Sequence, residues 1–272
     1  MQIIKKKNRG VTLIELMIAL VMSSVLIAAL YEVFIRHQKT YVLQEQIVDT
    51  QQSVRIALNR MVSEIRMAGF GGVENVLSLA GGVNGFTQVI TPGPKRITIV
   101  GGFKQIRRDN GEPILVSSVS GNQITLNYAT NEFDRLAHRF ISIGGLESST
   151  VLKRDRRILT LSNPLKWNHP AGTPVFKIQA ITYTTGLSGL RIILQRDENT
   201  GGGPQPVAEN IEEIQFEYFD ANGNTTADPP KIRMVRVTAT ARTDRPDPYL
   251  KIGDGYRRRQ IASHIYIRNM GL

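Results

Sequence analysis

The stretch KKKNRGVTLIELMIAL, Lys5 to Leu20, determines how this chain begins to fold. A cluster of cations precedes Gly10, and an apolar run follows it with a carboxylate, Glu15, near its start. Inserting a carboxylate into a membrane helix costs about 2.5–3.5 kcal/mol, so such a residue usually has a partner. The cations are Lys5, Lys6, Lys7 and Arg9.

The apolar run is long enough to cross a membrane. From Val11 to Ile35 the only charged residues are Glu15 and Glu32, and a spanning helix needs about 20 residues. We therefore expect a transmembrane segment over residues 11–35. The cations before it predict that the amino end stays in the cytoplasm and that the chain beyond about residue 36 crosses the membrane.

Three interpretations of this segment compete. A secretory signal peptide would need a cut site, for which Ile27-Ala28-Ala29 is a weak candidate. An uncleaved signal anchor would leave Glu15 without an explanation. Cleavage after Gly10 would instead create an ammonium on Val11, and residues four apart share a helix face. That ammonium could reach Glu15 of its own chain or of a neighbour, and the spacing allows both.

The sequence KNRGVTLIELMIAL resembles the leader and first helix of type IV prepilins and of type II secretion pseudopilins. The resemblance implies that residues 1–10 are a leader, that prepilin peptidase cuts between Gly10 and Val11, and that Val11 is N-methylated. It also implies that Glu15 neutralises the amino terminus of a neighbouring subunit during assembly. The family usually begins its mature chain with Phe, where this chain has Val11.

The helical pattern continues beyond the membrane segment. Apolar residues recur with a period near 3.6, which predicts an amphipathic helix over residues 36–70. Polar residues such as Glu45 and Glu64 lie between them, and Gly69 to Gly72 should end the helix. A helix from Val11 to Ala68 would have about 58 residues and a length of roughly 87 Å. The apolar residues are Leu43, Ile47, Val54, Leu58, Met61 and Ile65.

Residues 71–272 change to a strand-like pattern with frequent glycine and proline. About ten strands are expected, in one large sheet or two, with exposed loops at Pro92–Pro94 and Gly201–Pro206. The predicted fold is therefore α+β and pilin-like, with a long amino-terminal helix packed on a mostly antiparallel β body. The expected strands lie within 96–103, 112–129, 139–145, 149–162, 173–185, 189–197, 211–220, 231–243 and 261–269.

The end of the chain refines the resemblance. The segment from Gln205 to Gly223, the alternating strand VRVTATAR and the final IRN are similar to PilW-type minor pilins. The resemblance implies a minor pilin that primes pilus assembly and sits in a tip complex. Its implied partners are other minor pilins, the major pilin, prepilin peptidase and the inner-membrane assembly platform. Its implied location is the inner membrane, with a periplasmic body, and then the pilus at the cell surface.

Two other functions compete with this one. J-type minor pseudopilins of type II secretion show a comparable but shorter arrangement, and the length of this chain favours the pilus protein. The alternative of another class is a membrane-anchored module that binds DNA or a surface.

Composition argues against catalytic and metal chemistry. The chain has no cysteine, and its four histidines share no metal-ligand spacing. No phosphate-binding loop, nucleophile elbow or HExxH motif occurs, so we expect neither an enzyme nor a cofactor. Of the net charge of +11, four charges lie before Gly10, which leaves 11 − 4 = +7 for the remaining chain.

Three weaker candidates remain. Lys153–Arg157 and Tyr256–Arg259 are basic clusters. Exposed edge-strand or turn charges are the simpler interpretation, and binding to DNA or an anionic surface is the alternative. Trp167 is expected to be a packing anchor. The stretch DANGNTTAD has oxygen ligands at alternate positions, as calcium loops do, but an Asn-Gly turn explains it more simply. The ligands of such a calcium loop would be Asp220, Asn222, Asn224 and Asp228.

Overall fold

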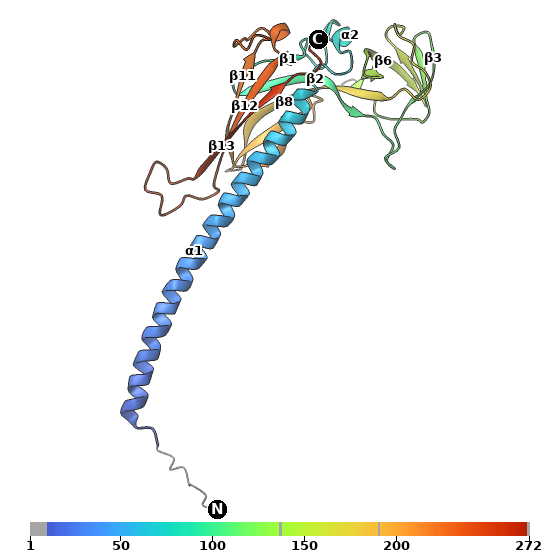
Figure 1. Ribbon diagram of the computed structural model, residues 1–272. Coiled ribbons are helices and arrows are strands. Elements are labelled where there is room, and N and C mark those ends of the chain that lie inside the picture. Colours follow the sequence, from blue (N-terminus) through green and yellow to red (C-terminus); the bar gives the residue numbers. More distant parts are fainter. Residues whose placement is uncertain (1–9, 136–137, 190, 271–272) are drawn as a thin grey trace, which may run out of the picture. The chain divides into compact units, whose positions relative to one another are not determined.

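The computed structural model of the chain describes residues 10–135, 138–189 and 191–270 (Figure 1). The contacts divide the chain into two compact units, one ending at Val48 and the other beginning at Asp49. The second unit contains all the strands, which pair in antiparallel fashion throughout. The expected α+β class, with a long helix packed on a mostly antiparallel body, is confirmed.

The first element is one continuous helix, α1 (Leu13–Arg66), of 54 residues. It starts two residues after the expected Val11 and ends two before the expected Ala68. The helix stays unbroken because no proline occurs in it. Gly69, Gly71 and Gly72 then adopt positive φ angles of 80°, 105° and 60°, which end the helix where the sequence predicted.

The segment Gly69–Gly72 also fastens the end of α1 to the sheet beside it. The Gly69 N–H donates to the Val100 carbonyl at 2.8 Å, and the Gly102 N–H donates to the Phe70 carbonyl at 2.7 Å. The Phe70 ring packs edge-on against Phe176, with ring centroids 5.1 Å apart. The sequence predicted a helix stop here but not this docking role.

The body contains two sheets. The larger follows the order β1-β2-β8-β5-β6-β7-β4-β3, and β9 pairs with both β8 and β10; the smaller has the order β11-β12-β13. A short helix, α2 (Glu74–Leu77), and a 3₁₀ turn at Pro229–Lys231 complete the fold. The strands are β1 (Ile90–Thr91), β2 (Arg96–Gln105), β3 (Val116–Ser120), β4 (Gln123–Leu126), β5 (Phe140–Ile143), β6 (Glu147–Asp155), β7 (Ile158–Leu161), β8 (Val175–Ser188), β9 (Arg191–Asp197), β10 (Gln205–Glu209), β11 (Ile211–Phe219), β12 (Met234–Arg242) and β13 (Arg258–Tyr266).

The structure adds strands to the expected set. The loop predicted at Gly201–Pro206 is shorter, because Gln205 and Pro206 already belong to β10, which pairs with β9 through a bulge. Proline is tolerated there because β10 lies at the edge of its sheet. The expected loop at Pro92–Pro94 is correct, although Pro92 and Gly93 are half-buried.

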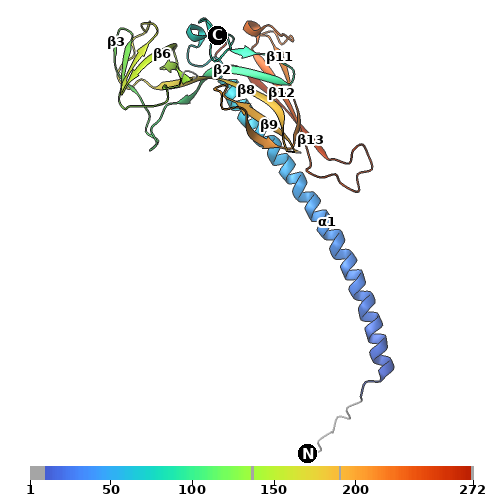
Figure 2. The ribbon, with the colours of Figure 1, turned by 180° about the vertical axis from the view of Figure 1, so that it is seen from behind.

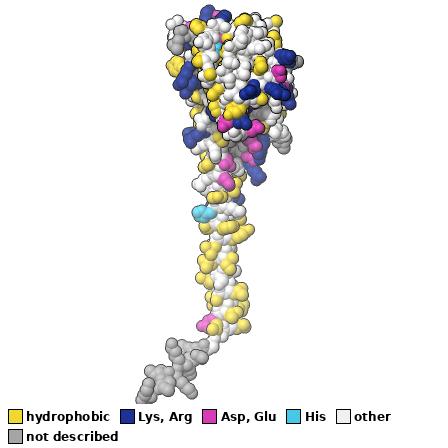
Figure 3. All heavy atoms as spheres, turned by 90° about the vertical axis from the view of Figure 1, so that its right-hand side faces the viewer, with side chains coloured by type: hydrophobic (Ala, Val, Ile, Leu, Met, Phe, Trp, Pro, Cys, Tyr) yellow, Lys and Arg dark blue, Asp and Glu magenta, His cyan; other side chains and the backbone are white. Residues whose placement is uncertain are grey.

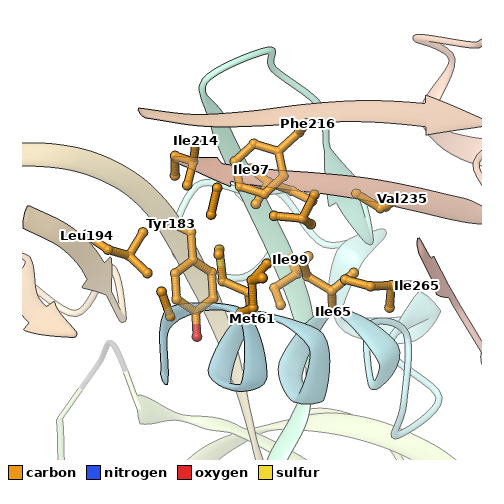
Figure 4. Close-up of a cluster of buried hydrophobic side chains, with 14 of the residues drawn as sticks. Met61, Ile65, Ile97, Ile99, Tyr183, Leu194, Ile214, Phe216, Val235 and Ile265 are labelled. Atoms are coloured by element: carbon orange, nitrogen blue, oxygen red, sulfur yellow. The ribbon is translucent and has the colours of Figure 1, made fainter. Parts of the chain in front are cut away.

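The main core lies between α1 and both sheets (Figure 4). The predicted apolar stripe supplies Val54, Leu58, Met61 and Ile65, all buried, whereas Leu43 and Ile47 are half-buried. Burial of each such side chain stabilises the fold by about 1.5–3 kcal/mol. The sheets contribute Ile97, Ile99, Tyr183, Leu194, Ile214, Phe216, Val235 and Ile265.

A second core lies in the middle of the chain, where the resemblance to the pilin family is weak. It fills the space between β3, β4, β5, β6 and β7, which form a lobe on the far side of β8 (Figures 1 and 2). Its members include Ile124, Ile141 and Leu159, each completely buried. The segment from Ile106 to Val175 therefore has a packed core of its own.

Candidate functional site

The predicted cleavage point is accessible. Gly10 is exposed, and among the described residues no atom beyond those of its chain neighbours lies within 4 Å of the position that a Cβ would occupy there. Val11 is 74% exposed and precedes the first turn of α1. A peptidase could therefore reach the bond between them. The predicted leader cations Lys5, Lys6, Lys7 and Arg9 lie outside the described residues.

Glu15 has a local partner in the uncut chain. Its Oε2 accepts hydrogen bonds from the backbone N–H of Thr12 at 2.8 Å and from the Thr12 hydroxyl at 2.9 Å. In return, the Glu15 N–H donates to Thr12 Oγ1 at 3.3 Å. This reciprocal arrangement is a capping box, with Thr12 as the N-cap residue and Glu15 three positions later.

The capping box was missed in the sequence, although its signal, Thr-x-x-Glu before an apolar run, is present. It shows how the carboxylate is satisfied before any new ammonium exists. It also bears on the pairing of Glu15 with Val11. Because α1 begins at Leu13, Val11 is not in the helix, and the four-residue helical spacing between Val11 and Glu15 is not present in this structure.

The first half of α1 has the surface of a membrane or filament helix. An 18-residue window in α1 reaches a mean hydropathy of 2.5, and none of it is buried. Large apolar side chains are exposed all round this half, with Leu13, Ile18 and Phe34 each more than half exposed. Figure 3 shows such side chains as yellow spheres on one face of the helix. A helix that is apolar on every side needs an apolar surrounding.

Residues 5–31 match the family model of the prokaryotic N-terminal methylation motif. That match, together with the exposed apolar helix, supports a type IV prepilin-like protein anchored in a membrane. The matched segment contains Gly10, Val11, Thr12 and Glu15. No curated protein and no solved structure matches the chain.

The candidate calcium loop is a turn in the structure. The Asp220 carboxylate accepts hydrogen bonds from the backbone N–H groups of Asn222 and Asn224, at 2.8 and 2.9 Å. Gly223 takes a φ of +82°, as the Asn-Gly turn requires. Asp228 pairs with Lys231 at 3.0 Å. The Asp220 carboxylate is thus engaged within the turn and the Asp228 carboxylate just after it, and the simpler interpretation fits the geometry.

The two basic clusters are partly neutralised by neighbouring acids. Arg154 forms a two-pronged ion pair with Asp134. Arg258 bridges Glu212 and Asp254, and its hydrogen bonds to them measure 2.6–2.9 Å. Such pairing favours structural turn charges over a continuous phosphate-binding track.

A buried ion network joins α1 to the larger sheet. Glu64 is only 7% exposed, although the sequence pattern grouped it with the polar residues of the helix. Its carboxylate accepts hydrogen bonds from the Tyr183 hydroxyl at 2.8 Å and from Arg196 Nε at 3.0 Å. Burial, together with the Glu64 carboxylate, raises the pKa of Tyr183 above its usual value of 10. Tyr183 therefore remains a hydrogen-bond donor.

The expectation that Trp167 is a packing anchor is wrong, because its side chain is 63% exposed. The loop that carries it is held by Glu147, which is buried. Glu147 accepts hydrogen bonds from the N–H groups of Lys166 and Trp167, at 2.9 and 3.1 Å, and contacts His169 Nε2 at 2.6 Å. The backbone of this loop is thus held in place by Glu147, while the Trp167 side chain is exposed.

Acid should release this loop. Burial raises the pKa of the Glu147 carboxyl, but the hydrogen bonds from Lys166, His169 and Trp167 outweigh burial and hold the pKa below its usual value of 4.5. A carboxyl group whose pKa is lowered by folding stabilises the folded state at pH values above its usual, unfolded-state pKa. This stabilisation is lost as the pH falls through the lowered, folded-state pKa. Trp167 is the only tryptophan in the chain, so its fluorescence should change with a midpoint below pH 4.5. The Glu147→Gln variant should lack that transition, whereas a midpoint above 4.5 would contradict the assignment.

Proposed function

We propose that this chain is a minor pilin of a type IV pilus, made as a precursor and cut after Gly10. The carrying observation is the methylation motif over residues 5–31, which opens directly into the exposed apolar half of α1. The proposed role is structural and not catalytic. The large β body, with its second lobe, supports a subunit that occupies a special position and is not repeated along the filament.

The proposed mechanism is ordered assembly. The leader cations orient the precursor with its amino end in the cytoplasm and its body in the periplasm. Before cleavage, the capping box with Thr12 satisfies Glu15. Cleavage creates the Val11 ammonium, and in the assembled filament Glu15 pairs with the amino terminus of a neighbouring subunit. Apolar helices that pack against one another have no strongly preferred axial register, and a charged pair of this kind fixes it.

Proteolytic processing gives a direct test. Mass spectrometry of the mature protein should find a chain that begins at N-methylated Val11. A Gly10→Val variant should keep the leader and accumulate as precursor. Among the described residues, a Cβ at position 10 meets no atom beyond those of its chain neighbours, so the change should act on processing and not on the fold. Asn8→Ala, in the same leader, is the matched control and should be processed normally. A mature chain that begins at Met1, or near Leu30 as after a secretory signal, would refute the proposal.

A minor pseudopilin of a type II secretion system is the second candidate, because the same motif serves both systems. Deletion of the gene distinguishes them. Loss of surface pili with intact protein secretion supports the pilus role, and loss of secretion with normal piliation supports the pseudopilin. Normal piliation and secretion would leave the binding module as the better hypothesis.

A further inference from the structure

Strand β13 ends the smaller sheet with an uncovered edge. Within the part of the chain that the structure describes, the strand pairs only with β12, in an unbroken antiparallel register from Met234↔Tyr266 to Arg242↔Arg258. Figures 1 and 2, which view the molecule from opposite sides, both draw it on the outer side of the sheet. The opposite edge is partly covered, since the Phe216 N–H of β11 donates to the Pro94 carbonyl at 2.9 Å. The two edges of this sheet are therefore not equivalent.

The register shows which backbone groups face outward. Just beyond the two ends of the pairing, the Thr243 N–H donates to the Arg257 carbonyl at 2.9 Å, and the Ile267 N–H donates to the Arg233 carbonyl at 3.0 Å. In an antiparallel ladder the hydrogen-bonding direction alternates along each strand. The odd-numbered residues of β13 therefore bond to β12, and the even-numbered residues point their N–H and C=O groups away from it. Among the described residues, none forms a hydrogen bond with these outward backbone groups, which belong to Arg258, Gln260, Ala262, His264 and Tyr266.

We propose that this edge accepts an extended acidic strand from a neighbouring protein, which would continue the sheet beyond β13. Unpaired edge groups are a template for strand addition. On the face that packs toward the core, Ile261 and Ser263 are only half-buried. An added strand with apolar residues at alternate positions would cover them.

The positive charge at the β13 edge favours an acidic partner strand. The edge and its flanks carry Arg257, Arg258, Arg259 and Arg268, with no acidic residue within β13. Asp247 pairs with Arg257, and both Glu212 and Asp254 pair with Arg258. Arg259 is exposed and has no charged or hydrogen-bonding side-chain partner among the described residues. The edge thus keeps an excess of positive charge for an incoming carboxylate.

The same sheet shows how such a strand is held. On its other side, β12 pairs with β11, whose sequence IEEIQFEYF places polar residues, three of them carboxylates, between buried apolar ones. Ile214 and Phe216 of β11 are buried in the core, while Glu217 lies opposite Arg236 and pairs with it at 3.2 Å. A cross-strand pair of opposite charge adds about 0.2–1 kcal/mol. A strand of this type placed beside β13 would meet the same combination of apolar and basic groups.

The test uses the full chain in detergent and a labelled peptide of the β11 sequence, IEEIQFEYF, whose binding is followed by fluorescence anisotropy. The control peptide has the basic β12 sequence, MVRVTATAR. The acidic peptide should bind, more weakly as salt increases, and the basic peptide should bind at least about tenfold more weakly. No binding of the acidic peptide, or equal binding of both, would overturn the proposal.

Two variants locate the binding to the edge. Ala262→Pro removes an outward N–H and no bond to β12, so the thermal unfolding midpoint should stay near that of the parent. Peptide binding should nevertheless fall at least about tenfold. Arg259→Glu should weaken the acidic peptide and strengthen the basic one. Unchanged binding in Ala262→Pro would place the peptide elsewhere and overturn the proposal. Self-association of the parent that Ala262→Pro abolishes would assign the edge to a second copy, which also overturns it.

Discussion

Replacing Gly72 with alanine is expected to destabilise the body more than any other single methyl addition in the Gly69–Gly72 segment. Gly72 has a φ of +60°, where alanine is strained by about 1–2 kcal/mol. The added Cβ would also lie 2.1 Å from the Leu146 carbonyl oxygen. Because this neighbour is backbone and not a flexible side chain, the loop itself must move. We expect a total loss of at least about 3 kcal/mol in the free energy of unfolding.

Thermal or urea unfolding of the full chain in detergent measures this loss. Gly81→Ala is the matched control, since Gly81 has a φ of +84° and nothing lies within 4 Å of its Cβ position. The control should therefore show only the strain of the left-handed backbone. Equal losses in the two variants would mean that the contact with Leu146 contributes nothing.

The clash between an alanine Cβ at position 72 and Leu146 matters because Gly72 lies where the chain leaves α1 and meets the larger sheet. Its carbonyl accepts a hydrogen bond from the Ser148 hydroxyl at 2.5 Å. One residue earlier, a Cβ on Gly71 would meet the Ser142 side chain at 2.9 Å. Because the glycines have no side chain, the segment that leaves α1 can pack closely against β5 and β6. This contact connects the main core with the second lobe.

The sequence predicted the features that depend on local pattern. The apolar run with Glu15, the stripe through Met61 and the alternation in β12 each repeat a simple period, and each is present in the structure. The helix end was also predictable, because glycine stops helices for reasons within a few residues.

Features that depend on distant residues were not predictable in this way. Pro206 was predicted to lie in a loop, yet it belongs to β10, which pairs with β9. No local pattern in the sequence identifies an edge strand of this kind. Glu64 looked like a solvated helix residue, yet Arg196 is its partner from 132 residues away. A buried carboxylate can be identified from sequence only when its partner is known. Thr12 is different, because its capping signal was in the sequence and was overlooked.

Removing the Glu64 carboxylate is expected to cost about 3–5 kcal/mol of folding free energy, because it leaves a buried charge without its partner. In a Glu64→Ala variant, Arg196 would lose an ion pair with an Nε–Oε2 distance of 3.0 Å, and the Tyr183 hydroxyl would lose its acceptor. Arg196 keeps Glu198 at 2.8 Å, but the Glu198 side chain is 42% exposed and is screened by solvent. Arg60 also pairs with Glu64, and because its own side chain is 53% exposed it should contribute little.

Urea unfolding of the full chain in detergent measures the effect, and two variants separate its causes. Glu64→Gln keeps the shape and an acceptor for Tyr183 while removing the charge, so its loss should be smaller than that of Glu64→Ala. Glu45→Ala, on the exposed face of the same helix, should change stability by no more than about 0.5 kcal/mol. If Glu64→Ala were as mild as Glu45→Ala, the network would not hold α1 on the sheet. The apolar stripe through Met61 and Ile65 would then contribute most of the free energy that holds the helix on the sheet.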